Sequence, residues 1–265
     1  MNLDFHDAIA RARQAGACLE VIQKLEAMSG WDEFARHPRA AEWAFWYACN
    51  VLQDRVWRLE PIIARDPQYA CRYASDVIRA RWPKGEAAIA KHPQWAWRYA
   101  RHVIRGPWPQ GEATIAESPA WAHCYAADVI RGRWPQGEPA IARNPRYAYY
   151  YAGKIIRGRW TQGEATIAKH PQWAYFYAFD VIRGPWPQGE ATIAKSSEWA
   201  YRYAADVIVG RWPQGEPAIV QSAEWACRYA RDVIGGRWPE AEPVILSNDE
   251  AASCYRRQVL GRTES

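Results

Sequence analysis

The sequence of 265 residues predicts an all-α protein, an α-solenoid of stacked helical hairpins with a helical cap at each end. Three observations predict this fold. The pair Trp-Pro recurs at steps of 26 residues, the apolar residues of each step follow the helical period, and residues typical of helix ends recur with them. Apolar residues make up 49% and charged residues 24% of the chain, a composition that excludes a disordered chain, a collagen and a coiled coil.

Eight units of 26 residues follow one another without insertion or deletion, which indicates a structural repeat. The predicted organisation is an N-terminal helical cap over 1–42, eight helical-hairpin repeats over 43–250, and a C-terminal cap helix and tail over 251–265. We count repeat positions from the first residue of each unit, and the units begin at Trp43, Tyr69, Trp95, Trp121, Tyr147, Trp173, Trp199 and Trp225.

The first half of each repeat predicts a long amphipathic helix. Positions 1, 5 and 9 give a bulky edge and positions 2 and 6 a small one, as in Trp199, Tyr203 and Val207 beside Ala200 and Ala204. Position 24 of the preceding repeat holds residues typical of N-caps, often followed by proline. Glycine at position 12 predicts a left-handed C-cap there, at Gly106, Gly132, Gly158, Gly184, Gly210 and Gly236. The long helix should therefore span about 13 residues.

The second half predicts a shorter helix that begins near position 18. Proline recurs at position 19, and only the first turn of a helix accepts proline without losing a hydrogen bond. A helix of about two turns is not stable alone and requires docking against its neighbours. We expect the bulky edge of one repeat to pack on the alanines of the next, so that stability is a sum of near-neighbour terms.

In layout, residues 43–262 resemble the tetratricopeptide and Sel1-like helical-hairpin repeats. The block Arg-Gly-Arg-Trp-Pro-Gln-Gly-Glu is also similar to that of uncharacterised bacterial or phage repeat proteins. The period of 26 is shorter than the mid-thirties of tetratricopeptide repeats, and their signature spacing is not matched. The resemblance implies binding of a peptide or protein.

The residues that could support catalysis do not converge. The six histidines lack metal-ligand spacing, and the six cysteines form no Cys-x-x-Cys motif and are typical of reduced thiols in a cytosol. The N-terminus has no secretory signal and no apolar run is long enough to span a membrane. We therefore expect a cytoplasmic, non-enzymatic binding or scaffold protein without cofactor or metal.

Charged residues recur at fixed positions. Glutamate occupies position 18 in all eight repeats, where it should complement the dipole of the short helix and pair with arginine at position 11 or 13. An arginine ladder beside aromatic residues would suit a nucleic acid, our alternative partner. Aspartate at position 8 is expected to neutralise most of this charge, in part through Arg72, Arg202 and Arg228, each four residues before an aspartate.

Outward positions 3, 4, 7 and 8 vary between repeats and predict the binding surface, for which a protein or peptide is the leading partner class. Tyr150, Phe176 and Phe179 are the expected anchors; tyrosines at position 3 could instead cover the short helix. Self-association is a further alternative, and no membrane partner is expected. The complete candidate set is Trp97, Arg98, Arg105, Arg131, Tyr149, Tyr150, Tyr175, Phe176, Phe179 and Tyr201.

Overall fold

A computed structural model describes residues 3–262, and within this range the chain contains helices and turns but no strand. The chain divides after Gly137 into two compact units. None of the helices within 3–262 is both long and apolar enough to cross a membrane.

The first unit holds the N-terminal cap and the first repeats. The cap helices are α1 (Phe5–Gln14), α2 (Leu19–Glu26) and α3 (Trp31–Phe34). The long helices are α4 (Ala40–Tyr47), α6 (Pro67–Arg72), α8 (Pro93–Tyr99) and α10 (Pro119–Tyr125). They continue into the π-helical turns η1 (Ala48–Leu52), η2 (Tyr73–Ile78), η3 (Ala100–Ile104) and η4 (Ala126–Ile130). The short helices are α5 (Glu60–Ile63), α7 (Pro83–Ile89) and α9 (Pro109–Glu117).

The second unit repeats the same pattern. Its short helices are α11 (Glu138–Ile141), α13 (Thr161–Ile167), α15 (Pro187–Ile193), α17 (Glu216–Ile219) and α19 (Glu242–Leu246). Its long helices are α12 (Pro145–Tyr151), α14 (Pro171–Phe176), α16 (Ser197–Tyr203) and α18 (Ala223–Tyr229). The π-helical turns are η5 (Ala152–Ile156), η6 (Tyr177–Ile182), η7 (Ala204–Ile208) and η8 (Ala230–Ile234). The chain ends in α20 (Asp249–Gln258) and the 3-10 turn η9 (Leu260–Arg262).

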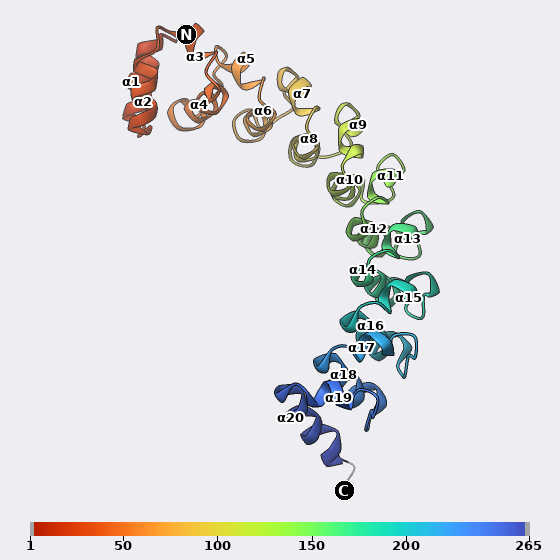
Figure 1. Cartoon of the computed structure of the whole chain (residues 1–265). Helices are drawn as coiled ribbons and strands as arrows, with labels where there is room; N and C mark the ends of the chain where they lie inside the picture. Colours follow the sequence, from red (N-terminus) through yellow and green to blue (C-terminus); the bar gives the residue numbers. More distant parts are fainter. Residues whose placement is uncertain (1–2, 263–265) are drawn as a thin grey trace. The chain divides into compact units, whose positions relative to one another are not determined.

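Within each unit the repeats form two layers of helices (Figure 1). Each long helix packs beside the long helix of the next repeat, as α6 does with α8 and α14 with α16. Where a whole repeat lies within one unit, the short helix packs against the long helix of its own repeat, as α9 does against α8. The predicted α-solenoid of helical hairpins is confirmed.

The Trp-Pro-x-Gly motif explains how closely the two layers approach. The indole of Trp82 is buried, and a Cβ placed on Gly85 would lie 2.6 Å from its Cε3 and 3.1 Å from the Cβ of Ala70. A side chain at Gly85 would thus collide with the indole as it lies, although in the last repeat Ala241 takes the same position beside buried Trp238. Ala70 belongs to the same repeat as Gly85. The small edge of the long helix therefore packs against the short helix of its own repeat, and not only against the bulky edge of the next repeat.

The left-handed residue at the end of each long helix lies at position 11, so the prediction of glycine caps at position 12 was wrong. Seven non-glycine residues there have φ between 52° and 61°, and Gly235 has φ 72°. The reason is the π-helical last turn, in which the N–H of Arg183 donates to the carbonyl of Ala178 at 2.7 Å. The seven non-glycine residues are Gln53, Arg79, Arg105, Arg131, Arg157, Arg183 and Val209.

Candidate interaction surfaces

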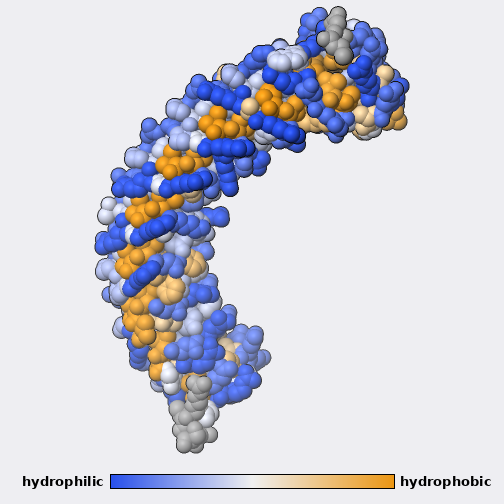
Figure 2. Space-filling model, turned by 180° about the vertical axis from the view of Figure 1, so that it is seen from behind, coloured by the Kyte–Doolittle hydropathy of each residue, from blue (hydrophilic) through white to orange (hydrophobic). Residues whose placement is uncertain are grey.

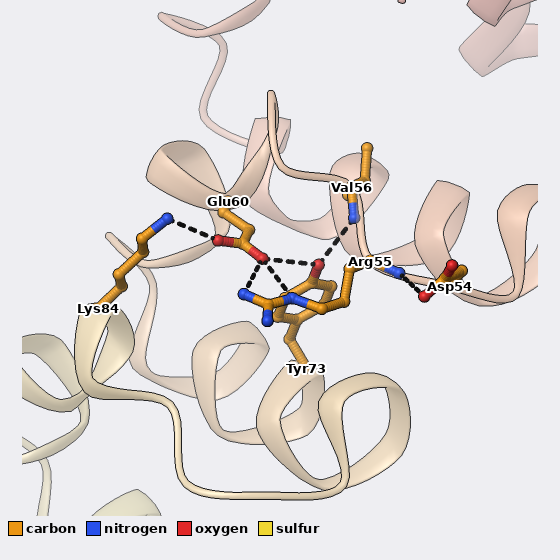
Figure 3. Close-up of polar contacts among 6 residues, drawn as sticks. All are labelled: Asp54, Arg55, Val56, Glu60, Tyr73 and Lys84. Carbon is orange, nitrogen blue, oxygen red and sulfur yellow. Dashed lines mark hydrogen bonds and ion pairs between the residues drawn. The ribbon is translucent and has the colours of Figure 1, made fainter. Parts of the chain in front are cut away.

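A buried polar network joins neighbouring repeats within each unit, and Figure 3 shows the first copy. The hydroxyl of Tyr73 accepts the backbone N–H of Val56 at 2.9 Å and donates to the carboxylate of Glu60 at 3.4 Å. Arg55 donates to the same carboxylate at 2.7 and 3.0 Å, and Lys84 donates at 2.9 Å. Glu60 is fully buried, so its charge depends on these donors.

The network, which we call the repeat lock, recurs as a hydrogen bond between the glutamate at position 18 and the tyrosine at position 5 of the next repeat. An arginine at position 13 joins it except in the two repeats where that position is Pro107 or Pro185. In the second copy the hydroxyl of Tyr99 lies 2.7 Å from the N–H of Trp82 and 2.9 Å from Glu86. The predicted glutamate pairing is thus confirmed for position 13. The ion pairs recorded in the structure are Arg55–Glu60, Arg81–Glu86, Arg159–Glu164, Arg211–Glu216 and Arg237–Glu242.

The protonation of the repeat lock follows from its geometry. The hydrogen bond from Arg81 lowers the pKa of Glu86, so this carboxylate is ionised at neutral pH. Burial raises the pKa of Tyr73 to about 12, so its hydroxyl remains a donor. The tyrosine contribution was missed in the sequence, although position 5 is tyrosine in every repeat and never phenylalanine, which signals a required hydroxyl.

The arginines at position 11 stand apart from this network. Arg105, Arg131, Arg157 and Arg183 are exposed, and their side chains make no hydrogen bond or ion pair with any residue in 3–262. Arg79 reaches only the carbonyl of Asp76, at 3.4 Å. The expectation that aspartates at position 8 neutralise this row was therefore wrong.

The aspartates are held by other partners. Asp206 and Asp232 accept the hydroxyls of Tyr175 and Tyr201 from the preceding repeat, at 2.6 and 2.8 Å. Arg202 and Arg228 consequently pair with Glu198 and Glu224, at 3.1 and 2.8 Å, instead of with these aspartates. Arg72 does face Asp76 as predicted, at 3.8 Å. Tyrosine at position 3 thus ties neighbouring long helices together, as Tyr149 also does by donating to Asp180.

Two of the free arginines, Arg105 and Arg131, border one surface hollow of about 890 Å³ in the first unit. Its other charged residues include Arg101 and Asp128, which form an ion pair at 2.6 Å. Val129 lines the hollow too. It is one of the half-buried aliphatic residues at positions 9 and 10 of each repeat. Figure 2 shows such hydrophobic surface gathered in a band within each unit, interrupted at regular intervals by strongly hydrophilic side chains.

The second unit carries a contiguous aromatic cluster on its long helices. The ring of Tyr149 lies 5.1 Å from that of Tyr150 and 6.0 Å from that of Phe176. Tyr175 stacks on Phe179 at 5.9 Å and contacts Phe176 at 5.2 Å. The structure therefore brings together these five predicted site residues from α12, α14 and η6.

The members of the cluster differ in exposure. Phe179 is 45% exposed, and Tyr150 and Phe176 are half-buried. Tyr175 is only 5% exposed, because its ring is covered and its hydroxyl is bound to Asp206, so it supports the surface from below. The ring of Tyr201 contacts that of Trp225, with centroids 5.5 Å apart, and extends the aromatic surface to α16 and α18.

The remaining candidates lie in the first unit. The indole of Trp97 is half-buried against Trp121, with ring centroids 5.3 Å apart. Arg98 is exposed, and its guanidinium lies 5.1 Å from the ring of Trp95. Arg105 and Arg131 belong to the same unit. The aromatic cluster of the second unit also has cations beside it, since Arg146 and Lys154 lie 5.9 and 5.1 Å from the ring of Tyr150.

The fold and these surfaces define an all-α helical-repeat protein. No protein-family model, curated protein or solved structure matches the chain. Within residues 3–262, no group of three or more histidine, cysteine, aspartate or glutamate side chains could hold a metal ion.

Proposed function

We propose that this chain is a non-enzymatic scaffold that binds a protein or peptide through its long helices. The observation that carries the proposal is the contiguous cluster of Tyr150, Phe176 and Phe179, whose rings are partly exposed beside the rigid repeat locks. Partly exposed aromatic side chains that lie together are typical of the residues that supply most of the binding energy at interfaces.

The hydrogen bonds that hold the tyrosines beneath the cluster in place indicate that the exposed rings form a binding surface. Tyr149 and Tyr175 are fixed by hydrogen bonds to Asp180 and Asp206, so the rings above them need little ordering when a partner docks. A surface that is ordered before binding loses less conformational entropy on association. Apolar or aromatic side chains of a peptide are the groups that this cluster would receive.

The test uses peptides selected from a displayed library against the immobilised wild-type protein. We expect the double variant Phe176→Ala, Phe179→Ala to bind the selected peptides about 30-fold more weakly, the loss of roughly 2 kcal/mol typical of two interface anchors. Leu246→Ala is the matched control, because Leu246 is 43% exposed in the short-helix layer of the same unit. Equal affinities for the double variant and wild type, or no selected peptide at all, would refute the proposal.

A second candidate function, binding of single-stranded nucleic acid, is favoured by the free arginines at position 11. Arg105 and Arg131 border one hollow, no carboxylate within 3–262 is bound to either, and aromatic residues lie in the same unit. Guanidiniums that are free of internal partners can neutralise phosphates, while aromatic rings stack on bases.

Fluorescence anisotropy with a labelled oligo(dT), titrated against salt, tests this candidate. Each phosphate contact contributes a slope of about −0.7 to the plot of log affinity against log salt, so Arg105→Gln with Arg131→Gln should lower the slope by about 1.4. Arg81→Gln is the control, since Arg81 is bound to Glu86. An unchanged slope in the double variant, or no binding at low salt, would exclude a phosphate role for these arginines.

A further inference from the structure

The long helices that carry the aromatic cluster form the most basic part of the long-helix layer in the second unit. Segments 145–158 and 171–184, which contain the neighbouring helices α12 and α14 with their π-helical turns, hold four cations and one carboxylate, Asp180. The two following segments of this layer, 197–210 and 223–236, hold three cations and four carboxylates. The excess of positive charge therefore coincides with the partly exposed rings.

The four cations of these two segments have no carboxylate partner in the described part of the chain. Arg146 and Lys154 are exposed and lie 5.9 and 5.1 Å from the ring centroid of Tyr150. Arg157 and Arg183 follow the π-helical turns and are exposed as well. Exposed cations without internal partners attract a partner of opposite charge and help to set its orientation.

Gly153 leaves an open place on this surface. It lies three residues after Tyr150 and four before Arg157, so the three residues share one face of the long helix. A Cβ on Gly153 would meet only the Cγ2 of Val181 within 4 Å, at the ordinary contact distance of 3.8 Å. Packing therefore does not require glycine here, although glycine destabilises a helix relative to alanine. The missing side chain leaves room for a side chain of a partner at an exposed position.

The residues between the rings and the arginines along each helix favour a peptide over a nucleic acid. They include Ile155, Ile156, Val181 and Ile182, all half-buried. Aliphatic side chains pack with other apolar side chains, whereas bases require aromatic faces on which to stack. A second copy of this chain is a poor match for a basic surface, because the chain itself has a formal net charge of +5.

We propose that the partner docked on the aromatic cluster is an acidic segment of another protein, an inference that rests on the proposed function. Apolar side chains of the segment pack on the exposed rings and beside Gly153, and its carboxylates pair with the four free cations. The two kinds of contact divide the work as at other interfaces, since the apolar anchors supply most of the affinity and the charges select an acidic partner.

The test uses short peptides selected from a displayed library against the full-length wild-type protein and then synthesised with a fluorescent label. We expect the selected peptides to contain more aspartate and glutamate than lysine and arginine, and to bind more weakly as the salt concentration rises. The double variant Arg157→Gln, Arg183→Gln should bind them about tenfold more weakly and melt as wild type does, because it removes two interfacial ion pairs.

The double variant Lys169→Gln, Lys195→Gln is the matched control. Both lysines are exposed, have no ion pair with any residue that the structure describes, and lie just beyond the short helices α13 and α15. The control removes the same net charge and should bind the peptides as wild type does. An equal loss of affinity in the control would overturn the inference, because net charge alone would then account for the effect.

A further variant tests the open place beside Gly153. Gly153→Leu should melt no lower than wild type, since leucine is the better helix former and the space beside this residue is open. It should bind the selected peptides about tenfold more weakly, because the new side chain takes the place of a side chain of the peptide.

The outcomes separate this inference from the proposed function on which it rests. Peptides that lose affinity in Phe176→Ala, Phe179→Ala but are not acidic, or that bind Arg157→Gln, Arg183→Gln or Gly153→Leu as they bind wild type, would overturn the inference alone. Peptides that the phenylalanine variant binds with unchanged affinity would refute the proposed function itself. Tighter binding of oligo(dT) than of the acidic peptides, or a dimer in sedimentation that these peptides dissociate, would overturn the inference by identifying a different occupant.

Discussion

Arginines at positions 13 and 11 of the repeat stand two residues apart in sequence and differ in almost every physical respect. Arg81 and Arg159 are bound to Glu86 and Glu164, at 2.7 and 3.0 Å, within the repeat locks. Arg131 and Arg157, at position 11, have no side-chain partner within 3–262 and adopt left-handed backbone conformations with φ 59°. The first row belongs to the fold, and the second is available for binding.

Local geometry rather than residue type separates the two rows. Position 13 precedes by five residues a glutamate in the first turn of the short helix, so the guanidinium folds back onto the carboxylate. Position 11 follows the π-helical turn and points its side chain to solvent, while nearby aspartates such as Asp206 are occupied by tyrosine hydroxyls. Glycine adopts a positive φ readily, as Gly235 does, whereas arginine is strained in this conformation. A strained backbone conformation of this kind is typical of a functional position.

Removal of a buried carboxylate from the repeat lock should give the largest effect. Glu86→Ala leaves the Tyr99 hydroxyl and Arg81 without their acceptor, and we expect a loss of about 2 kcal/mol in the free energy of unfolding. Chemical denaturation followed by circular dichroism measures it. Glu117→Ala is the control, since Glu117 is exposed and unpaired within 3–262; a loss as large in the control would show that the effect is not due to the lock.

Relief of backbone strain in the position 11 row should have a smaller effect of opposite sign. Arg157→Gly should stabilise the protein by about 1 kcal/mol, because glycine adopts a positive φ without steric conflict. Gly235→Arg is the reciprocal change and should destabilise by a similar amount. Thermal denaturation of both variants decides the point, and a loss of stability in Arg157→Gly would mean that this guanidinium contributes to the fold.

Acid should weaken the repeat lock gradually. Hydrogen bonds from Arg81 and Arg237 lower the pKa of Glu86 and Glu242 from the ordinary value of 4.5. Because the folded-state pKa is depressed, the stabilisation is present above the unfolded pKa and is lost as the pH falls through the folded value. Melting temperatures measured from neutral pH to pH about 3 should fall less steeply for Glu86→Gln than for wild type. Parallel curves would exclude a contribution from the ionised Glu86.

The architecture was predictable because its determinants are local and repeated. The Trp-Pro period, the wheel around Tyr203 and the recurring prolines all act within one hairpin, and the structure has a helix in each half of the repeat. The predicted start of the short helix near position 18 is correct where position 19 is proline; in the other repeats the helix begins at position 15, as at Pro83 and Thr161. The pairing of glutamate at position 18 with arginine at position 13 could also be predicted, because the two residues are only five apart in the sequence.

Contacts between repeats and the detailed ends of helices were not predictable in the same way. The π-helical turn that moves the left-handed residue to Arg183 depends on how the last turn packs, which a helical wheel does not contain. The hydrogen bond from Tyr175 to Asp206 spans 31 residues and competes with a local arginine. The Tyr47 hydroxyl has no hydrogen-bond partner within 3–262 because Phe34 stands where the other repeats have a glutamate. This replacement can be recognised only once the hydrogen bond from Tyr73 to Glu60 is known.

The claim that one arginine row builds the fold while the other does not is tested most directly by two fourfold variants with arginine changed to glutamine. The position 11 set is Arg105, Arg131, Arg157 and Arg183. The position 13 set is Arg81, Arg159, Arg211 and Arg237. We predict that the melting temperature is unchanged in the first variant and clearly lowered in the second, because only the second removes donors from buried or half-buried carboxylates. An equal fall in both variants, or a fall in the first alone, would contradict the account.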